Sequence, residues 1–367
     1  MVKPFVVFFS GASYVGGGEI SLLSLGELMK DDWDITLICT DPELAEAWEK
    51  RISDNVLLSS LPSLKKKLSH VGKFFKEGLK VKSFLWNSLK NSSTSVLYFV
   101  NTPYSVPIIL LFQRFFLYAR VISAVRTEIN ESDLLRDKYK FSKVDGLLFS
   151  SNFLKKKVEP YIPCRVAQSV IYPFIDTGEI QYSQRNFDSP LRVGVVGSIS
   201  PLKGQDFVLK LAKLCPEYVF FIIGHPLDYH FWSELKSYCS RFKLKNVVWI
   251  DWLDDKNEIY NKIDVLLVPS FVEGFGRVIP EAFCSGALVL TNNNVGMCEL
   301  INNGVEAFLL DRLDVYSWKE KLKWIRDCPE KAKEMTKKAR EKASILFNPI
   351  RIKAHWKEYV ESVLQNR

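Results

Sequence analysis

The sequence lacks the closely spaced cysteines that disulfide-bonded and zinc-binding proteins require. Its cysteines are odd in number and none has a partner at close spacing: Cys39, Cys164, Cys215, Cys239, Cys284, Cys298 and Cys328. This scatter predicts buried free thiols in a reducing compartment. It argues against both a disulfide framework and a zinc site, and we expect no metal.

Long uncharged apolar runs are also absent. The best candidate, Pro107 to Leu117, is interrupted by Arg114, whereas a membrane-spanning helix needs about 20 apolar residues. The apolar run at the N-terminus, residues 1–9, is too short for a secretory signal and is typical of a first strand. The sequence therefore predicts a cytoplasmic protein.

What the chain does have is length and a repeated pattern. Its 367 residues, 47% of them hydrophobic, are enough for two cores. Short apolar runs alternate with helical stretches, which predicts α/β domains with parallel sheets covered by helices. The predicted strands are 5–9, 35–39, 96–100, 121–125, 146–149 and 166–171, then 192–196, 219–223, 247–250, 264–268, 288–290 and 307–310.

The two series of strands predict two Rossmann-like domains with a cleft between them. The first would span residues 1–172 and the second 191–349. Between them, residues 173–190 turn polar and irregular and are the predicted linker. The tail, about 350–367, has apolar residues at helical spacing and is predicted to be a final helix.

The net charge of +8 is concentrated in one segment. Between Leu64 and Lys90, eight lysines face a single acid, Glu77, and apolar residues are interleaved with them. Such a segment, 64–90, predicts peripheral contact with anionic lipid headgroups on the inner face of a membrane. The alternative is a solvated helix pair whose apolar stripe faces its own domain. Because no recognisable nucleic-acid motif accompanies it, we expect no nucleic-acid partner.

The densest motif is residues 270–282, Ser-Phe-Val-Glu-Gly-Phe-Gly-Arg-Val-Ile-Pro-Glu-Ala. It follows a predicted buried strand and opens a helix, whose first turn offers unpaired N–H groups to an anion. Gly274 and Gly276 allow a ligand to approach the backbone. Glu281, about one turn into the helix, can accept hydrogen bonds from a diol such as a ribose. The alternative is that Glu273 and Glu281 only cap and solvate the helix start.

This motif resembles that of the family 4 retaining glycosyltransferases, the glycosyl transferases group 1, which have the GT-B fold. The resemblance implies that Glu273 contacts the transferred sugar and Glu281 the nucleotide ribose. It also implies that the backbone of residues 274–278 lies along the sugar and diphosphate: Gly274, Phe275, Gly276, Arg277 and Val278. In that fold the last helix crosses back to the first domain, so the tail helix is expected to do the same.

Two further loops fit the same family. Residues 195–204 end in Lys203-Gly204, and the resemblance makes Lys203 the cation for the diphosphate. The glycines Gly16, Gly17 and Gly18 follow the first strand and resemble the family's first-domain loop beside the donor, with Gly17 and Gly18 as donor contacts. A flexible turn is the alternative for the glycines, and a surface lysine near a turn is the alternative for Lys203.

The chain departs from the family at two places. Ser198 stands where the family usually has an arginine, and Arg126 stands after a strand where many relatives have a histidine. We expect another cation, Arg277 or Arg126, to compensate for Ser198, or donor affinity or turnover to be reduced. Arg126 is a candidate catalytic residue that holds a phosphate; alternatively it pairs with Glu128 or Asp133 as a structural residue.

Two loops are candidates by position. Trp252 and Leu253 stand where members of that family place backbone and an apolar side chain against the nucleobase. The alternative is a core position, which is more common for an aromatic residue after a strand. Residues 101–104 follow a predicted strand and are expected to meet the acceptor.

The sequence thus predicts a metal-independent retaining glycosyltransferase without a cofactor. It would move a hexose from a GDP-, UDP- or ADP-sugar to a hydroxyl of a glycan or lipid-linked acceptor, in polysaccharide or glycoconjugate biosynthesis. Lys203, Glu273 and Arg126 are its predicted catalytic residues. The alternatives are a nucleotide-sugar epimerase or hydrolase of the GT-B fold, and a non-catalytic nucleotide-sugar-binding partner subunit.

Overall fold

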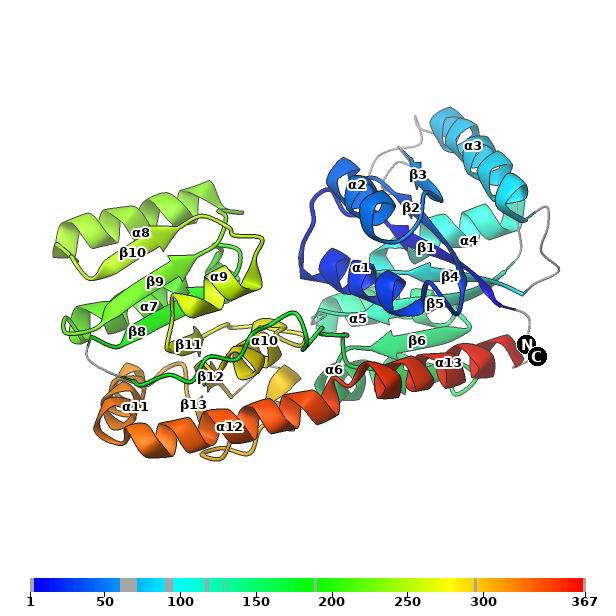
Figure 1. Cartoon of the computed structure of the whole chain (residues 1–367). Coiled ribbons are helices and arrows are strands. Elements are labelled where there is room, and N and C mark those ends of the chain that lie inside the picture. Colours follow the sequence, from blue (N-terminus) through cyan, green and yellow to red (C-terminus); the bar gives the residue numbers. More distant parts are fainter. Residues whose placement is uncertain are drawn as a thin grey trace. The chain divides into compact units, whose positions relative to one another are not determined.

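The chain forms two compact units in a computed structural model (Figure 1), which describes residues 3–59, 71–89, 95–115, 119–127, 129, 131–187, 190–293 and 296–365. The first unit comprises Met1–Phe174 and Pro349–Arg367, and the second comprises Ile175–Asn348. The final helix therefore belongs to the first unit although it follows the second in sequence.

The first unit is a parallel sheet with helices packed on it. In the described part of the chain its strands run in the order β3-β2-β1-β4-β5-β6-β7. The strands are β1 (Phe5–Ser10), β2 (Asp34–Cys39), β3 (Val56–Leu58), β4 (Val96–Val100), β5 (Arg120–Val125), β6 (Gly146–Phe149) and β7 (Ala167–Val170). The helices are α1 (Gly17–Met29), α2 (Pro42–Arg51), α3 (Val71–Leu89), α4 (Val106–Phe115), α5 (Glu131–Phe141), α6 (Asn152–Val158) and α13 (Pro349–Gln365), with 3₁₀ turns at Pro103–Ser105 and Glu159–Tyr161.

Continuous apolar runs explain the sheet. Every residue of β1, Phe-Val-Val-Phe-Phe-Ser, is buried, as expected for a parallel strand covered on both faces. Helix α13 packs on this unit through contacts with α1, β5 and β7. Two ion pairs connect α13 to the residues before β2, because Lys353 and Lys357 each lie 2.5 Å from a carboxylate oxygen of Asp32. These two lysines lower the pKa of Asp32.

The second unit repeats the architecture. Within the described ranges its strands run in the order β10-β9-β8-β11-β12-β13. The strands are β8 (Arg192–Val196), β9 (Val219–Ile223), β10 (Val247–Ile250), β11 (Val265–Val268), β12 (Leu288–Asn292) and β13 (Ala307–Leu310). The helices are α7 (Gln205–Leu214), α8 (Tyr229–Phe242), α9 (Lys256–Asn261), α10 (Val278–Ser285), α11 (Val315–Asp327) and α12 (Pro329–Leu346), with 3₁₀ turns at Pro201–Lys203 and Gly296–Leu300. The predicted class, two α/β units with parallel sheets, is confirmed.

Residues 175–190, treated above as a linker, pack onto the second unit where the structure describes them. Ile175, Ile180 and Phe187 are at most 2% exposed, and the Ser183 amide donates to the carbonyl of Ser285 at 3.0 Å. Three isolated apolar side chains are thus buried in a segment whose other residues are mostly exposed or half-buried. Gly286 permits the close approach: its φ is +86°, and a Cβ there would lie 2.5 Å from the Ser183 carbonyl oxygen.

Each sheet has one point where the strand order reverses, between β1 and β4 in the first unit and between β8 and β11 in the second. In open parallel sheets, ligands bind beyond the carboxyl ends of the strands at this point. The loops after β1, β8 and β11 are the ones that carry the predicted donor-binding glycines, Lys203 and Glu273. The topology therefore directs attention to the same loops as the motifs do.

Candidate nucleotide-sugar site

The loops after β8 and β11 touch at the switch point of the second unit. The Phe271 amide donates to the carbonyl of Leu202 at 2.9 Å. Gly204, with φ +76°, packs directly against the carbonyl of Pro269, where a Cβ would collide. This glycine is therefore required by the close approach of the two loops, and the residue before it, Lys203, is held over the end of β11.

Lys203 and Glu273 form an ion pair across these loops. Their side chains are 29% and 17% exposed, so the pair is accessible from one side and partly shielded from water. The predicted diphosphate cation and the predicted sugar contact are thus adjacent in the structure. A ligand that places a phosphate by Lys203 and a sugar hydroxyl by Glu273 would engage both charges at once.

The turn between Glu273 and α10 is tight. Gly276 has φ +86°, and a Cβ there would lie 3.1 Å from the Cγ of Glu273. Gly274 and Phe275 are buried, and Val278 is the first residue of α10. Gly276 therefore allows the chain to turn beneath the Glu273 side chain. The approach of a ligand to the backbone at Gly274 and Gly276 stays a prediction.

Glu281 lies in the first turn of α10 and is 8% exposed. The Tyr260 hydroxyl lies 2.9 Å from its Oε2, and the ammonium of Lys256 lies 3.5 Å from its Oε1. The guanidinium of Arg277 is 4.0 Å from Oε1. A hydroxyl-bearing side chain and two cations thus surround this carboxylate, which shows that it can accept a hydrogen bond from an alcohol.

Burial lowers the pKa of Arg277, an effect that the Glu281 carboxylate opposes. The side chain of Arg277 is only 11% exposed and lies against Glu281. Its role as a substitute for the arginine missing at position 198 stays a prediction. The Ser198 carbonyl accepts from Gln205 Nε2 at 3.0 Å.

Sequence reasoning missed Lys256 and Tyr260. Both lie on α9, four positions apart, which places them on one face of the helix. A Lys and a Tyr at this spacing are common on any half-buried helix, so the pattern alone had no specificity. Only the packing of α9 against α10 brings them to Glu281.

Trp252 and Leu253 lie in the loop between β10 and α9, close in sequence to Lys256. Trp252 is 44% exposed, so the alternative of a core aromatic does not hold. A large exposed indole beside the loop end of a sheet offers a face on which a base can stack.

The first unit has its own polar network at its switch point. Glu19, at the start of α1, accepts from Ser10 Oγ at 3.1 Å and from Asn101 Nδ2 at 3.0 Å. Arg126 Nε donates to Asn101 Oδ1 at 2.8 Å. A Cβ on Gly18 would lie 3.5 Å from the Asn101 amide nitrogen and 3.8 Å from Arg126 Cδ, whereas Gly17 has open space around it. The predicted glycine loop and Arg126 are therefore neighbours. Glu128 lies outside the described residues.

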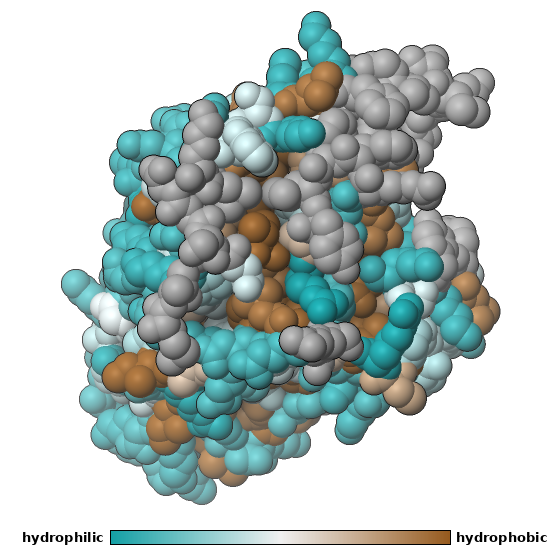
Figure 2. All heavy atoms as spheres, turned by 90° about the vertical axis from the view of Figure 1, so that its right-hand side faces the viewer, coloured by the Kyte–Doolittle hydropathy of each residue, from teal (hydrophilic) through white to brown (hydrophobic). Residues whose placement is uncertain are grey.

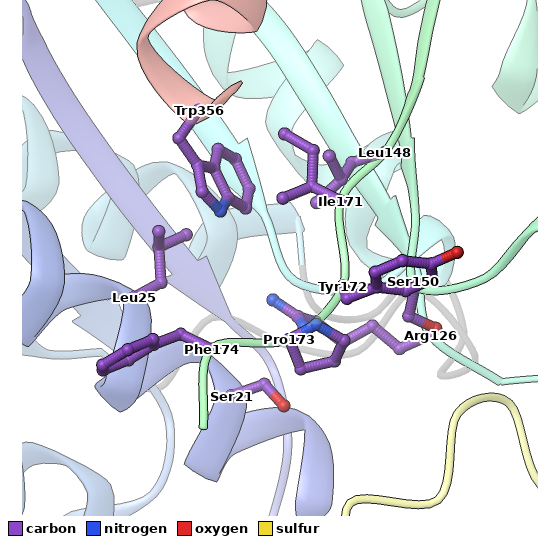
Figure 3. A pocket seen from close by; sticks show the side chains of 10 residues that line it. All are labelled: Ser21, Leu25, Arg126, Leu148, Ser150, Ile171, Tyr172, Pro173, Phe174 and Trp356. Atoms are coloured by element: carbon purple, nitrogen blue, oxygen red, sulfur yellow. The ribbon is translucent and has the colours of Figure 1, made fainter. Parts of the chain in front are cut away.

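Arg126 also lines a small cavity in the first unit, of about 10 Å³. Figure 3 shows Arg126 among side chains of α1, of α13 and of the segment after β7, including Ser21, Tyr172 and Trp356. Ser150 lines the cavity too, and its buried hydroxyl has no hydrogen-bond partner among the described residues. The space suits about one water molecule, which would satisfy that hydroxyl.

Comparison with known proteins gives a family match for the second unit. Residues 176–342 match the family Glycosyl transferases group 1. A protein of the cps region of Klebsiella pneumoniae is 30% identical over 148 residues, which cover 36% of this chain and 39% of that protein. The O-antigen biosynthesis glycosyltransferase WclY of Escherichia coli is 26% identical over 134 residues, covering 34% of this chain and 37% of WclY.

Among solved structures, Anabaena Alr3699/HepE in complex with UDP and glucose superposes with a TM-score of 0.84 at 18% identity, covering 98% of this chain and 100% of that one. The two units therefore make up the GT-B fold. The matches span less than half the length of the curated relatives above. The match to the family Glycosyl transferases group 1 lies wholly within the second unit, and the resemblance seen in residues 270–282 is confirmed.

Proposed function

We propose that the protein is a retaining glycosyltransferase that moves a hexose from a nucleoside diphosphate sugar to a hydroxyl group. The observation that carries the proposal is the arrangement in the second unit: Lys203 paired with Glu273, and Glu281 buried one turn into α10. A cation, a sugar-facing carboxylate and a diol-binding carboxylate are the groups such a donor requires.

The chemistry assigned to these residues is mainly binding and charge stabilisation. As the glycosidic bond to the diphosphate breaks, negative charge develops on the leaving oxygen, and Lys203 together with the amides at the start of α10 would stabilise it. Glu273 would orient the hexose. In front-face substitution the departing diphosphate oxygen itself takes the acceptor proton, so no protein base is required. We propose that this proceeds without a metal or a further cofactor.

The acceptor is proposed to be a glycan or a lipid-linked glycan. The names of the E. coli relative, an O-antigen biosynthesis glycosyltransferase, and of the Klebsiella protein from a cps region support a role in polysaccharide or glycoconjugate biosynthesis. Arg126 and residues 101–104 of the first unit are the proposed acceptor-side groups. Arg126 would hold a phosphate of donor or acceptor.

A thermal-shift screen of UDP, GDP and ADP and their hexose conjugates tests the donor. UDP is the first candidate because a structure with the same fold holds UDP and glucose. One nucleotide at 100 times its Kd should add about 2.7 kcal/mol to the free energy of unfolding. No shift with any nucleotide would contradict the proposal. Binding without transfer to any acceptor would instead favour the partner-subunit alternative, and release of free hexose or of an epimer would favour the hydrolase or the epimerase.

We also propose that α3 contacts an anionic membrane. Residues 64–70 and 90 of the predicted patch lie outside the described residues, but most of α3 is described. Val81 and Leu85 are buried in the core of the unit, while Leu79 and Trp86, seven positions apart on another face, are 59% and 61% exposed. The alternative, an apolar stripe that faces its own domain, explains the burial of Val81 and Leu85. It does not explain why Leu79 and Trp86 are exposed.

Lysines accompany the exposed apolar residues. Lys76, Lys80 and Lys82 are exposed, and Lys80 pairs with Glu77 at 2.8 Å. Lys76 and Lys82 have no ion-pair partner within the described ranges, and both share the outer face with Leu79. Figure 2 views the side of the molecule on which α3 lies in Figure 1, and hydrophobic residues are scattered there among hydrophilic ones. An indole beside lysines suits the headgroup region of an anionic bilayer.

Liposome sedimentation tests this surface. Vesicles with anionic phosphatidylglycerol should bind the protein, and Trp86→Ala with Lys76→Glu and Lys82→Glu should reduce binding about tenfold or more, since each basic residue near the surface contributes about 1 kcal/mol. Lys243→Glu with Lys245→Glu, two exposed lysines of the second unit, is the matched control. Equal binding of the protein to neutral and anionic vesicles, or binding that does not depend on salt, would contradict the membrane contact and leave α3 with a structural role only. No helix in the described part of the chain has the length and hydropathy of a membrane span.

A further inference from the structure

Tyr260 is a deeply buried hydroxyl-bearing residue beside Glu281. It is 1% exposed and belongs to α9. Its hydroxyl lies 2.9 Å from Glu281 Oε2 and 3.2 Å from the carbonyl oxygen of Val278. A phenol has one proton to donate, and the charged and nearer acceptor is the carboxylate.

The tyrosine itself is firmly held. Its backbone carbonyl accepts from the guanidinium of Arg185 at 2.9 Å, and Arg185 is only 5% exposed. Burial raises the pKa of Tyr260 well above its ordinary value, and the Glu281 carboxylate adds to this effect. The hydroxyl therefore stays protonated at physiological pH and remains a donor to Glu281.

The two oxygens of Glu281 consequently differ. Oε2 is on the buried side, with Tyr260. Oε1 is on the side of Lys256, whose side chain is 26% exposed compared with 11% for that of Arg277. A ligand hydroxyl approaching from solvent would meet Oε1, next to Lys256, the more exposed of its two cationic partners.

We propose that Tyr260 is a positioning residue that sets the ribose specificity of this site without touching the ligand. The inference rests on the proposed function, because it assigns a nucleotide ribose to Glu281. By fixing Oε2, Tyr260 prevents the glutamate side chain from turning and presents Oε1 to the ribose diol. A ligand that lacks the hydroxyls would cover Oε1 without donating a hydrogen bond to it, so the site disfavours that ligand.

The test compares ribose with its dideoxy form. Calorimetry gives the Kd of the nucleoside diphosphate that stabilises the protein most, among UDP, GDP and ADP, and the Kd of its 2′,3′-dideoxy counterpart. Tyr260→Phe removes one oxygen and retains the ring. Specificity for ribose is measured by the ratio of the Kd of the dideoxy form to the Kd of the ribonucleotide. Tyr260→Phe should weaken binding of the ribonucleotide and so lower this ratio by about tenfold, the effect of one hydrogen bond to a charged group.

Tyr218→Phe is the matched control. Tyr218 is also 1% exposed and in the same unit, and its buried hydroxyl lacks a hydrogen-bond partner in the part of the chain that is described. This variant should keep the wild-type ratio. A double-mutant cycle adds Glu281→Gln: if Tyr260 acts through Glu281, Tyr260→Phe should lower the ratio far less when Glu281→Gln is already present.

The outcomes separate the two claims. A ratio unchanged in Tyr260→Phe, or lowered equally in both backgrounds, would overturn the positioning role while wild-type binding left the proposed function intact. Absence of nucleotide binding by the wild-type protein would overturn the proposed function and this inference with it.

Discussion

A Lys203→Ala variant should bind a nucleoside diphosphate roughly 10- to 100-fold more weakly than the wild type, the effect of losing one charged hydrogen bond to a phosphate. Turnover should fall by a further factor of roughly 10² to 10³, because the developing charge on the leaving group loses its cation. The reason is local: the lysine is held over the end of β11 by the contacts of Leu202 and Gly204. Glu273, 17% exposed, would also lose its partner.

Calorimetry and initial rates measure the two effects separately. Lys210→Ala is the control, because Lys210 is a lysine of the same unit that lies 3.5 Å from Asp206 and is 58% exposed. It should leave both quantities unchanged. If Lys203→Ala bound the nucleoside diphosphate with wild-type affinity, Lys203 would lose its assigned role, and the ion pair with Glu273 would be only structural.

A Glu281→Ala variant should lose affinity for ribose-bearing ligands, by about tenfold or more, and keep its affinity for free sugars. The carboxylate is the acceptor for the diol in this account, and its removal also leaves Tyr260 and Lys256 without their common partner. The buried Tyr260 hydroxyl would keep only the neutral carbonyl of Val278, 3.2 Å away, and would lose its hydrogen bond to a charged group, so the melting temperature should fall as well.

Glu281→Gln separates the two effects. It retains an oxygen for Tyr260 but removes the charge, so stability should largely recover while the ribonucleotide affinity should not. Glu258→Ala, a half-exposed acid on α9 that pairs with Lys262, controls for loss of a nearby negative charge. Wild-type nucleotide affinity in Glu281→Ala would remove the ribose assignment, whatever happened to stability.

Much of the fold could be predicted because buried parallel strands are continuous apolar runs. All twelve predicted strands occur, most within one residue of their predicted ends. One strand of the structure, β3, was not predicted from the sequence. It has only three residues, Val56–Leu58, at the edge of its sheet. Such an edge strand is fixed by its pairing with β2 and not by a local pattern.

The packing of residues 175–187 could not be predicted for a similar reason. Ile175, Ile180 and Phe187 are too widely spaced for a helical or strand period, yet all three are buried. The polar composition of the segment predicted exposure, and tertiary contacts overrode it.

The motif part of the site could be predicted and its surroundings could not. Lys203 and Glu273 lie beside glycines that backbone geometry requires, Gly204 and Gly276, and Glu281 lies in the first turn of the helix that follows, so local sequence carries the signal. Tyr260 and Lys256 reach Glu281 only through the packing of α9 on α10. The position of Arg277 against Glu281 likewise depends on a side-chain direction that the sequence does not contain.

The most direct measurement is a crystal structure of the protein with the nucleoside diphosphate that stabilises it most. The account predicts the diphosphate within hydrogen-bonding distance of Lys203 Nζ, the ribose hydroxyls on Glu281 Oε1, and Tyr260 still bonded to Oε2. A nucleotide bound away from the loops after β8 and β11, or a ribose with no contact to Glu281, would contradict it.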